Sequence, residues 1–288
     1  MPLLRDWTGD DVRRMLRAPG PADDKRSRGV VALRTGSPSY PGAAVLGVNG
    51  AWRAGAGYVR YLGEGAAADA VIASRPETVV SPARAGDLPA AGAWVIGSGT
   101  DPAHRAEDET ELLRTLLAGT APVVVDAGAL DLVAAASAPT VATPHAGELA
   151  RLRQRLGLGP VDPDALRTDD RARAASAAEV AAAAGTVVLL KGARTVVAAP
   201  GGESVLVSGE GTGWLATAGT GDVLAGVLGA LIAANPAVSL SEVAASGAWL
   251  HGRAGRIAAD AVDDRPGRPI VALDVADALP RAIEGILA

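Results

Sequence analysis

Short valine-rich runs alternate along this chain with longer segments that are rich in alanine and leucine. Runs of the first kind are typical of buried strands, and segments of the second kind are typical of amphipathic helices. Their alternation predicts an α/β fold, in which helices cover both faces of a central and mostly parallel sheet. The expected strands are residues 30–33, 94–96, 123–125, 140–142, 187–190 and 195–199, and the expected helices are 42–54, 107–117, 147–156, 169–184, 220–234, 241–260 and 280–287.

A turn sequence follows the last of these strands. Pro200-Gly201-Gly202 separates residues 195–199 from a second extended run at 203–207, which indicates a β-hairpin and therefore an antiparallel edge to the sheet. The chain has no internal repeat and no break in composition, so we expect one domain over residues 29–288. Residues 1–28 carry proline, glycine and charged clusters, and we expect a loosely ordered arm there.

Composition excludes several classes of protein. The formal net charge of −5 gives no electrostatic reason to bind nucleic acid or an anionic membrane. The chain has no cysteine, which rules out disulfides and thiolate chemistry and fits a reducing compartment. Its apolar runs are too short or too interrupted to span a bilayer. We therefore expect a cytoplasmic protein with no nucleic-acid or membrane partner.

The sequence Gly219-Thr220-Gly221-Asp222 opens one of the expected helices. Its small residues leave backbone N–H groups uncovered, and the helix N-terminus adds partial positive charge, so Gly219, Thr220 and Gly221 predict an anion hole for phosphate. A carboxylate beside a phosphate repels it. Asp222 is therefore expected to accept a proton from a substrate hydroxyl or to help hold a metal ion, and the alternative is a first-turn acid that only stabilises its helix.

Other motifs follow expected strands in the same way. Thr143-Pro144-His145-Ala146-Gly147-Glu148 comes after residues 140–142, Lys191-Gly192-Ala193-Arg194-Thr195 after 187–190, and Gly97-Ser98-Gly99 after 94–96, while Tyr40-Pro41-Gly42-Ala43-Ala44 opens the helix at 42–54. Ligands of open α/β sheets bind outside the carboxyl ends of the strands. The motifs are therefore expected to form one site.

Taken in order, these motifs resemble those of the ADP- or ATP-dependent NAD(P)H-hydrate dehydratases, a branch of the ribokinase-like superfamily. The resemblance covers residues 29–287 and implies a ribokinase-like three-layer sandwich. His145 separates this branch from the sugar and vitamin kinases, which commonly carry asparagine at that point. Two loops depart from the family pattern: Thr35 stands where relatives more often have glycine, and Ser98 stands where they have proline.

The resemblance also implies roles for individual residues. Nucleotide is expected at Lys191, Gly192, Ala193, Arg194, Thr195 and Gly221, substrate at Ala43, Gly99, His145 and Asp222, the catalytic base at Asp222, and Mg²⁺ near Glu148 through water. Each role has a structural alternative. Lys191 is also explained as a solvated strand-end lysine, His145 as a helix N-terminal residue that donates to a nearby carbonyl, and Glu148 as a first-turn acid.

The implied reaction is the dehydration of (6S)-NADHX or NADPHX to NADH or NADPH, with ADP consumed to AMP, or ATP to ADP, plus phosphate. Two alternatives stay open, namely a kinase for a small hydroxylated vitamin precursor and a nucleotide sensor without catalysis. Bacterial-type relatives favour ADP and often form homotetramers. The 28 residues before the first core strand leave no room for a fused epimerase domain, so a separate NAD(P)HX epimerase is the expected functional partner.

Overall fold

The computed structural model describes residues 4–207, 210–261 and 265–288. Its strands are β1 (Arg5–Asp6), β2 (Val30–Arg34), β3 (Tyr58–Leu62), β4 (Val79–Ser81), β5 (Ala93–Ile96), β6 (Val123–Val125), β7 (Thr140–Ala142), β8 (Val187–Leu190), β9 (Thr195–Ala198) and β10 (Ser204–Val207). Its α-helices are α1 (Gly9–Met15), α2 (Gly42–Arg53), α3 (Gly65–Ser74), α4 (Glu107–Leu117), α5 (Ala146–Arg155), α6 (Ala165–Thr168), α7 (Asp170–Ala184), α8 (Thr220–Ala234), α9 (Leu240–Ala259) and α10 (Ala272–Leu287), and the 3₁₀ helices are η1 (Pro102–His104), η2 (Ala127–Ala135) and η3 (Gly213–Leu215).

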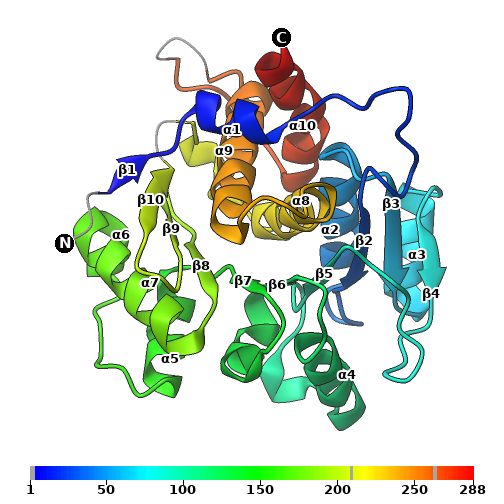
Figure 1. Cartoon of the computed structure of the whole chain (residues 1–288), viewed down its shortest axis with the longest axis horizontal. Helices are drawn as coiled ribbons and strands as arrows, with labels where there is room; N and C mark the ends of the chain where they lie inside the picture. The colour runs from blue at the N-terminus through cyan, green and yellow to red at the C-terminus, as the bar shows by residue number, and fades with distance from the viewer. Residues whose placement is uncertain (1–3, 208–209, 262–264) are drawn as a thin grey trace.

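These strands form one sheet in the order β1-β10-β9-β8-β7-β6-β5-β2-β3-β4 (Figure 1). The seven neighbouring strands from β8 to β4 in this order all pair in parallel. Strand β9 is antiparallel to both of its neighbours, β8 and β10. The predicted parallel centre and edge hairpin are confirmed. Strand β2 lies between β3 and β5, so the order of the strands reverses there, and such a switch point opens a crevice at the carboxyl ends.

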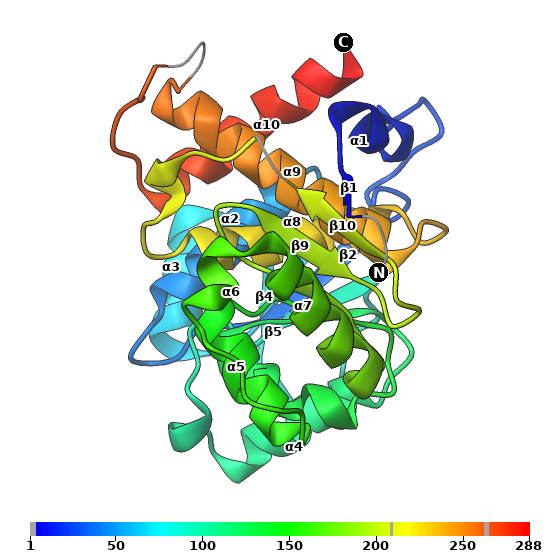
Figure 2. The ribbon, with the colours of Figure 1, turned by 90° about the vertical axis from the view of Figure 1, so that its left-hand side faces the viewer.

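Helices cover both faces of the sheet, which confirms the three-layer sandwich. In β6, Val124 packs into one apolar cluster with α2, α8, α9 and α10, whereas Val123 and Val125 pack into a second cluster with α4, α5 and α7. Side chains on a strand point alternately to its two faces, so an uninterrupted valine run is the expected sequence for this position. Figures 1 and 2 show the two helical layers on opposite sides of the sheet.

The N-terminal segment differs from the loosely ordered arm expected for residues 1–28. Strand β1 pairs in parallel with β10, and α1 begins with a capping box between Thr8 and Asp11. Trp7 and Val12 are buried in the main core, and the indole N–H of Trp7 donates to Ser246 Oγ at 3.1 Å. The apolar side chains of this short segment cover α9, which outweighs the polar composition around them.

The structure also extends the predicted list of elements. The sheet edge formed by β3 and β4, with α3 between them, was not predicted. The last helix begins at Ala272 instead of residue 280, and Pro280 lies inside it. Proline usually marks a helix start because it lacks the N–H that an interior position donates, so the prediction began the helix too late. In the part of the chain that the structure describes, every helix is too short or too polar to cross a bilayer.

Helices α2 and α8 touch through their backbones. A Cβ atom added at Gly226 would lie 2.0 Å from Gly47 O, and one added at Gly50 would lie 2.3 Å from Val223 O. Only glycine fits at such distances. The contact fixes the N-terminal ends of these two helices, both of which lie at the carboxyl edge of the sheet, relative to each other.

Candidate active site

Residues of three predicted motifs lie along one edge of the sheet, together with Asp126 and Gly36, which were not predicted as site residues. The order of the strands places Lys191 after β8, His145 after β7, Asp126 after β6, Gly99 after β5 and Gly36 after β2. All five follow the carboxyl ends of parallel strands or of the strand that begins the hairpin. The expectation that the motifs form one site is therefore met in space.

The anion hole has the expected backbone form. Gly219, with φ +89°, is the N-cap of α8, and no side chain caps this helix. The hydroxyl of Thr220 donates to the carbonyl oxygens of Leu215 (3.0 Å) and Thr217 (3.1 Å), so the threonine side chain stabilises the turn that precedes the helix. The first N–H groups of a helix have no acceptor within it, and these face the carboxyl edge of the sheet as donors for an anion.

Asp222 lies in the first turn of α8 and is half-buried. Burial, followed by the negative charge of Asp126, raises the pKa of Asp222 to about 6, while the Lys191 ammonium opposes the rise. A carboxylate with a pKa just below neutrality is mostly ionised at pH 7 and is a stronger base than an exposed aspartate. This environment supports a proton acceptor more than a simple helix-stabilising acid.

Lys191 points into the centre of the site. Its Nζ donates to Asp126 Oδ1 at 2.7 Å and lies 3.9 Å from Glu148 Oε2. Burial disfavours the charged form of both Asp126 and Lys191, yet their attraction prevails, so the pKa of Asp126 is lowered and that of Lys191 is raised. Nζ also lies 3.6 Å from the Cβ position of Gly221, beside the anion hole. The solvated strand-end alternative is wrong for this lysine.

Asp126 is a residue that the motifs missed. Its side chain is 2% exposed and accepts from Ser98 Oγ (2.9 Å) and Thr143 Oγ1 (2.7 Å) as well as from Lys191. One carboxylate thus joins the loops after β5, β7 and β8. The sequence does contain a signal for Asp126. It is an acidic residue directly after the buried valine strand β6, at the same edge of the sheet as the other strand-end motifs.

His145 and Glu148 cap α5 reciprocally. His145 Nδ1 accepts from the N–H groups of Gly147 (3.1 Å) and Glu148 (3.3 Å), and Glu148 Oε2 accepts from the His145 N–H at 2.8 Å. The alternative is therefore right in placing His145 at a helix N-terminus, but the ring accepts hydrogen bonds from N–H groups there instead of donating to a carbonyl. Burial lowers the pKa of His145, which suits this neutral acceptor form, and its side chain is still 55% exposed toward a ligand.

The residues present fit only an indirect magnesium site. In residues 4–207, 210–261 and 265–288, no group of three His, Cys, Asp or Glu side chains is arranged to hold a metal ion. Mg²⁺ commonly keeps several waters and binds one or two carboxylates together with substrate phosphates. Glu148 is already engaged with His145 and close to Lys191, so its oxygens suit a water-mediated contact to an ion that the nucleotide brings.

A cavity of about 410 Å³ lies beside the anion hole, between the loop after β8 and helices α8 and α9. Five of the six residues predicted for nucleotide line it, namely Lys191, Gly192, Ala193, Thr195 and Gly221. Arg194 is the exception, since its guanidinium pairs with Asp170 of α7 at 2.7 Å. The cavity lining therefore gives no support for Arg194 as a nucleotide contact, which stays a prediction.

The walls of this cavity are partly apolar, from Leu215, Leu224 and Ala248. His251 also lines it, and its Nε2 lies 2.9 Å from the carbonyl oxygen of Thr220. Burial lowers the pKa of His251 to about 4, so the ring is neutral at pH 7 and Nε2–H donates to that carbonyl. His251 thus fixes the first turn of α8 from behind. The lining of the cavity thus combines apolar side chains with a few polar groups, as small-molecule sites commonly do.

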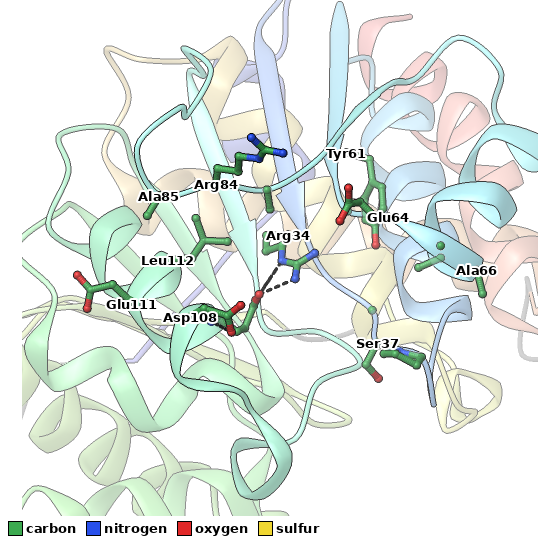
Figure 3. Close-up of a pocket in the computed structure, with 17 residues that line it drawn as sticks. Arg34, Ser37, Tyr61, Glu64, Ala66, Arg84, Ala85, Asp108, Glu111 and Leu112 are labelled. Carbon is green, nitrogen blue, oxygen red and sulfur yellow. Dashed lines mark hydrogen bonds and ion pairs between the residues drawn. The ribbon is translucent and has the colours of Figure 1, made fainter.

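Ala43 and Gly99, both expected to contact substrate, touch each other. A Cβ atom on Gly99 would lie 2.3 Å from Ala43 Cβ, and the Gly36 N–H donates to Ser98 O at 2.7 Å. This is the switch point between β2 and β5. From Gly36 a second cavity, of about 610 Å³, continues past the carboxyl ends of β2, β3 and β4 (Figure 3).

Comparison with known proteins decides between the readings of this site. The sequence model of the family described as NAD(P)H-hydrate dehydratase matches residues 31–280. The chain belongs to this family.

Individual members of the NAD(P)H-hydrate dehydratase family agree. The bifunctional NAD(P)H-hydrate repair enzyme Nnr of Mycobacterium tuberculosis (strain CDC 1551 / Oshkosh) is 45% identical over 235 residues, which are 77% of this chain and 45% of that protein. The ADP-dependent (S)-NAD(P)H-hydrate dehydratase of Neisseria meningitidis serogroup B is 35% identical over 84% of this chain and 80% of its own length. The chain spans about half the length of the Nnr relatives it matches.

A solved member of the family has the same fold. The ADP/ATP-dependent NAD(P)H-hydrate dehydratase of Bacillus subtilis, co-crystallised with ATP/Mg²⁺, superposes with a TM-score of 0.83 at 28% identity and covers 99% of both chains. The expected ribokinase-like sandwich of the NAD(P)H-hydrate dehydratases is confirmed over the described residues.

Proposed function

We propose that this chain dehydrates (6S)-NADHX and NADPHX to NADH and NADPH at the expense of a nucleoside phosphate. The observation that carries the proposal is the position of Asp222. Its carboxylate stands in the first turn of α8, whose N-terminus no side chain caps, and the preceding residue, Gly221, lines the cavity of about 410 Å³. The names of the relatives support the same reaction.

The chemistry begins as a phosphoryl transfer. Asp222 takes the proton of the C6 hydroxyl while that oxygen attacks the terminal phosphate of ADP or ATP. The backbone N–H groups of Gly219 to Asp222 and the Lys191 ammonium offset the negative charge that develops. Mg²⁺, held by the phosphates and through water by Glu148, would neutralise phosphate charge when bound.

The phosphorylated product then breaks down. The lone pair of the ring nitrogen expels phosphate from C6, and loss of a proton from C5 restores the double bond of the dihydronicotinamide. The nucleotide leaves as AMP or ADP. A kinase-like site thus serves a dehydration because its product is unstable.

Several finer properties belong to this proposal. We infer that Lys191, Gly192, Ala193, Thr195 and Gly221 bind the nucleotide, that Ala43, Gly99 and His145 contact the dinucleotide, and that ADP is preferred, as in the name of the Neisseria relative. A cytoplasmic homotetramer that works with a separate NAD(P)HX epimerase completes the proposal. Sedimentation velocity measures the oligomeric state.

One assay tests the reaction. The protein is incubated with NADHX, Mg²⁺ and either ADP or ATP, and the absorbance of NADH is followed while phosphate release is measured. Equal amounts of NADH and phosphate are expected. A stable phosphorylated product from a vitamin precursor, with no NADH from NADHX, would establish the kinase alternative, and nucleotide binding without either product would establish a sensor.

A further inference from the structure

The cavity that begins at Gly36 is the largest one bordering the site, and the proposed chemistry leaves it without a role. It is lined by the ends of β2 and β3, the N-terminus of α3, the loop after β4 and the first turns of α4 (Figure 3). Its volume of about 610 Å³ falls within the usual range for a small-molecule site. The nucleotide cavity shares no lining residue with it and lies at the loop after β8 and the first turn of α8.

The order of the strands makes this cavity the continuation of the substrate site. Asp126 follows β6, Gly99 follows β5, Gly36 follows β2 and Glu64 follows β3, in adjacent positions along the edge. Neighbouring strands lie about 4.8 Å apart, so three steps from β6 to β3 span roughly 14 Å. A dinucleotide that presents its hydrated ring to Asp222 must place its second nucleoside at such a distance from the reaction centre.

A smaller cavity on the other side of Gly99 is a weaker candidate. It is lined by Thr100, Gly128, Arg151 and Arg155 among others and has a volume of about 220 Å³. This is below the usual size of a ligand site. Its two arginines, Arg151 and Arg155, are offset by three carboxylates of the same lining, Asp101, Asp131 and Glu148, and are the alternative partners there for the extra phosphate of NADPHX.

Charge in the larger cavity is mainly negative. Arg34 is neutralised there, because its Nε lies 3.0 Å from both carboxylate oxygens of Glu109 and its NH1 donates to Leu62 O at 3.0 Å. The remaining charged residues of the lining are three exposed carboxylates and one exposed guanidinium, namely Glu64, Asp108, Glu111 and Arg84. Figure 3 shows Glu64, Asp108 and Arg34 around the same space.

Resting on the proposed function, we propose that this cavity binds the adenosine half of the dinucleotide substrate and that its carboxylates make the enzyme prefer NADHX to NADPHX. Carboxylates accept hydrogen bonds from the two hydroxyls of a ribose, as an acidic residue does in dinucleotide-binding folds. A 2′-phosphate replaces one of those hydroxyls with roughly two negative charges, which the three carboxylates repel.

The preference is measured as the ratio of kcat/KM for NADHX to that for NADPHX with the same nucleotide. A ratio of about ten is expected, and it should fall with added salt because exposed charges are screened. The triple variant Glu64→Gln, Asp108→Asn, Glu111→Gln should lower the ratio severalfold, mainly by improving kcat/KM for NADPHX. The single variant Glu64→Gln should move it in the same direction.

A matched triple variant removes the same charge elsewhere. Asp10→Asn, Asp162→Asn and Glu284→Gln lie outside the lining of this cavity, so the ratio should stay at the parent value. Equal turnover of both substrates, or an equal change in both triple variants, would overturn the inference. A preference for NADPHX that Arg151→Ala or Arg84→Ala abolishes would also overturn it and would assign the phosphate to that arginine. Failure to turn over either substrate would instead contradict the proposed function itself.

Discussion

Asp222 combines two properties at the scale of a single residue, a position at a helix N-terminus and a pKa raised to about 6 by burial and by Asp126. Replacing it with asparagine keeps the shape and removes the base. We expect Asp222→Asn to lower kcat by about 10²-fold or more, the usual scale for the loss of a positioned base. Nucleotide affinity, measured by calorimetry, should hold or improve because a charge that repels phosphate is gone. An unchanged kcat would assign Asp222 to helix stabilisation.

The pH dependence follows from the same residue. Below about pH 6 the Asp222 carboxylate is protonated and cannot accept the hydroxyl proton, so kcat/KM should fall as the pH drops through that value. The effect of this pKa on the stability of the fold runs the opposite way with pH. The folded pKa lies above the ordinary 3.8, so the ionised carboxylate disfavours folding above about pH 6, and this penalty is relieved as the pH falls.

The variant Asp126→Asn separates the two causes of the raised Asp222 pKa, which are burial and the charge of Asp126. It removes the negative charge that helps to raise the pKa of Asp222, so the acid limb should move to lower pH, whereas Asp162→Asn at an exposed position should leave it in place. Rate profiles of the two variants against pH make the comparison. An acid limb that stays near pH 6 in Asp126→Asn would mean that burial alone raises the pKa.

At the scale of elements, the backbone contact between α2 and α8 gives a sharp test. Gly226→Ala would place its methyl group 2.0 Å from Gly47 O, so the helices must separate, and we expect a loss of about 1 to 3 kcal/mol of stability from overpacking. Gly285→Ala is the matched control in α10, where a Cβ meets no atom within 4 Å and alanine favours the helix. Urea unfolding of both variants measures the difference, and equal stabilities would contradict the contact.

Some elements were predictable from local pattern alone. Strand β6 is the uninterrupted run Val123–Val125, and α4 begins with three acids and shows a clear apolar stripe, so both were predicted residue for residue. Strand β3 was missed because it places Arg60 between buried residues near the edge of the sheet. Its arginine lies over the Tyr58 ring, which is a tertiary contact that no local pattern contains.

Some features of the candidate site were likewise predictable from the sequence, and others were not. The positions of the loops at Gly219 to Gly221 and at Gly192 and Ala193 were predictable because these small residues stand directly at the start of a recognisable helix and at the end of a recognisable strand. The partner of Lys191 was not, since Asp126 is 65 residues away and the pairing depends on the order of β6, β7 and β8. Arg194 lies within a matching motif, yet Asp170 on a neighbouring helix directs it away from the nucleotide cavity.

At the scale of the whole molecule, Trp7 fastens the N-terminal segment to helix α9. Its ring is 6% exposed, and its hydrogen bond to Ser246 links positions 239 residues apart. We expect Trp7→Ala to lower stability by about 3 to 5 kcal/mol, as for other buried aromatic truncations. Trp214→Ala, at a side chain that is 38% exposed, should cost less than about 1 kcal/mol. Thermal unfolding of both variants measures the contrast, and similar melting temperatures would make the N-terminal segment dispensable.

The two large cavities share no lining residue and lie at separate places along one continuous sheet, one after β8 and the other after β2, β3 and β4. Neither ligand has to pass through the cavity of the other to reach the centre. We therefore expect nucleotide and dinucleotide to add in random order, because the two cavities have no lining residue in common. Initial-rate lines for the two substrates therefore intersect instead of running parallel, and neither substrate at saturation blocks the other.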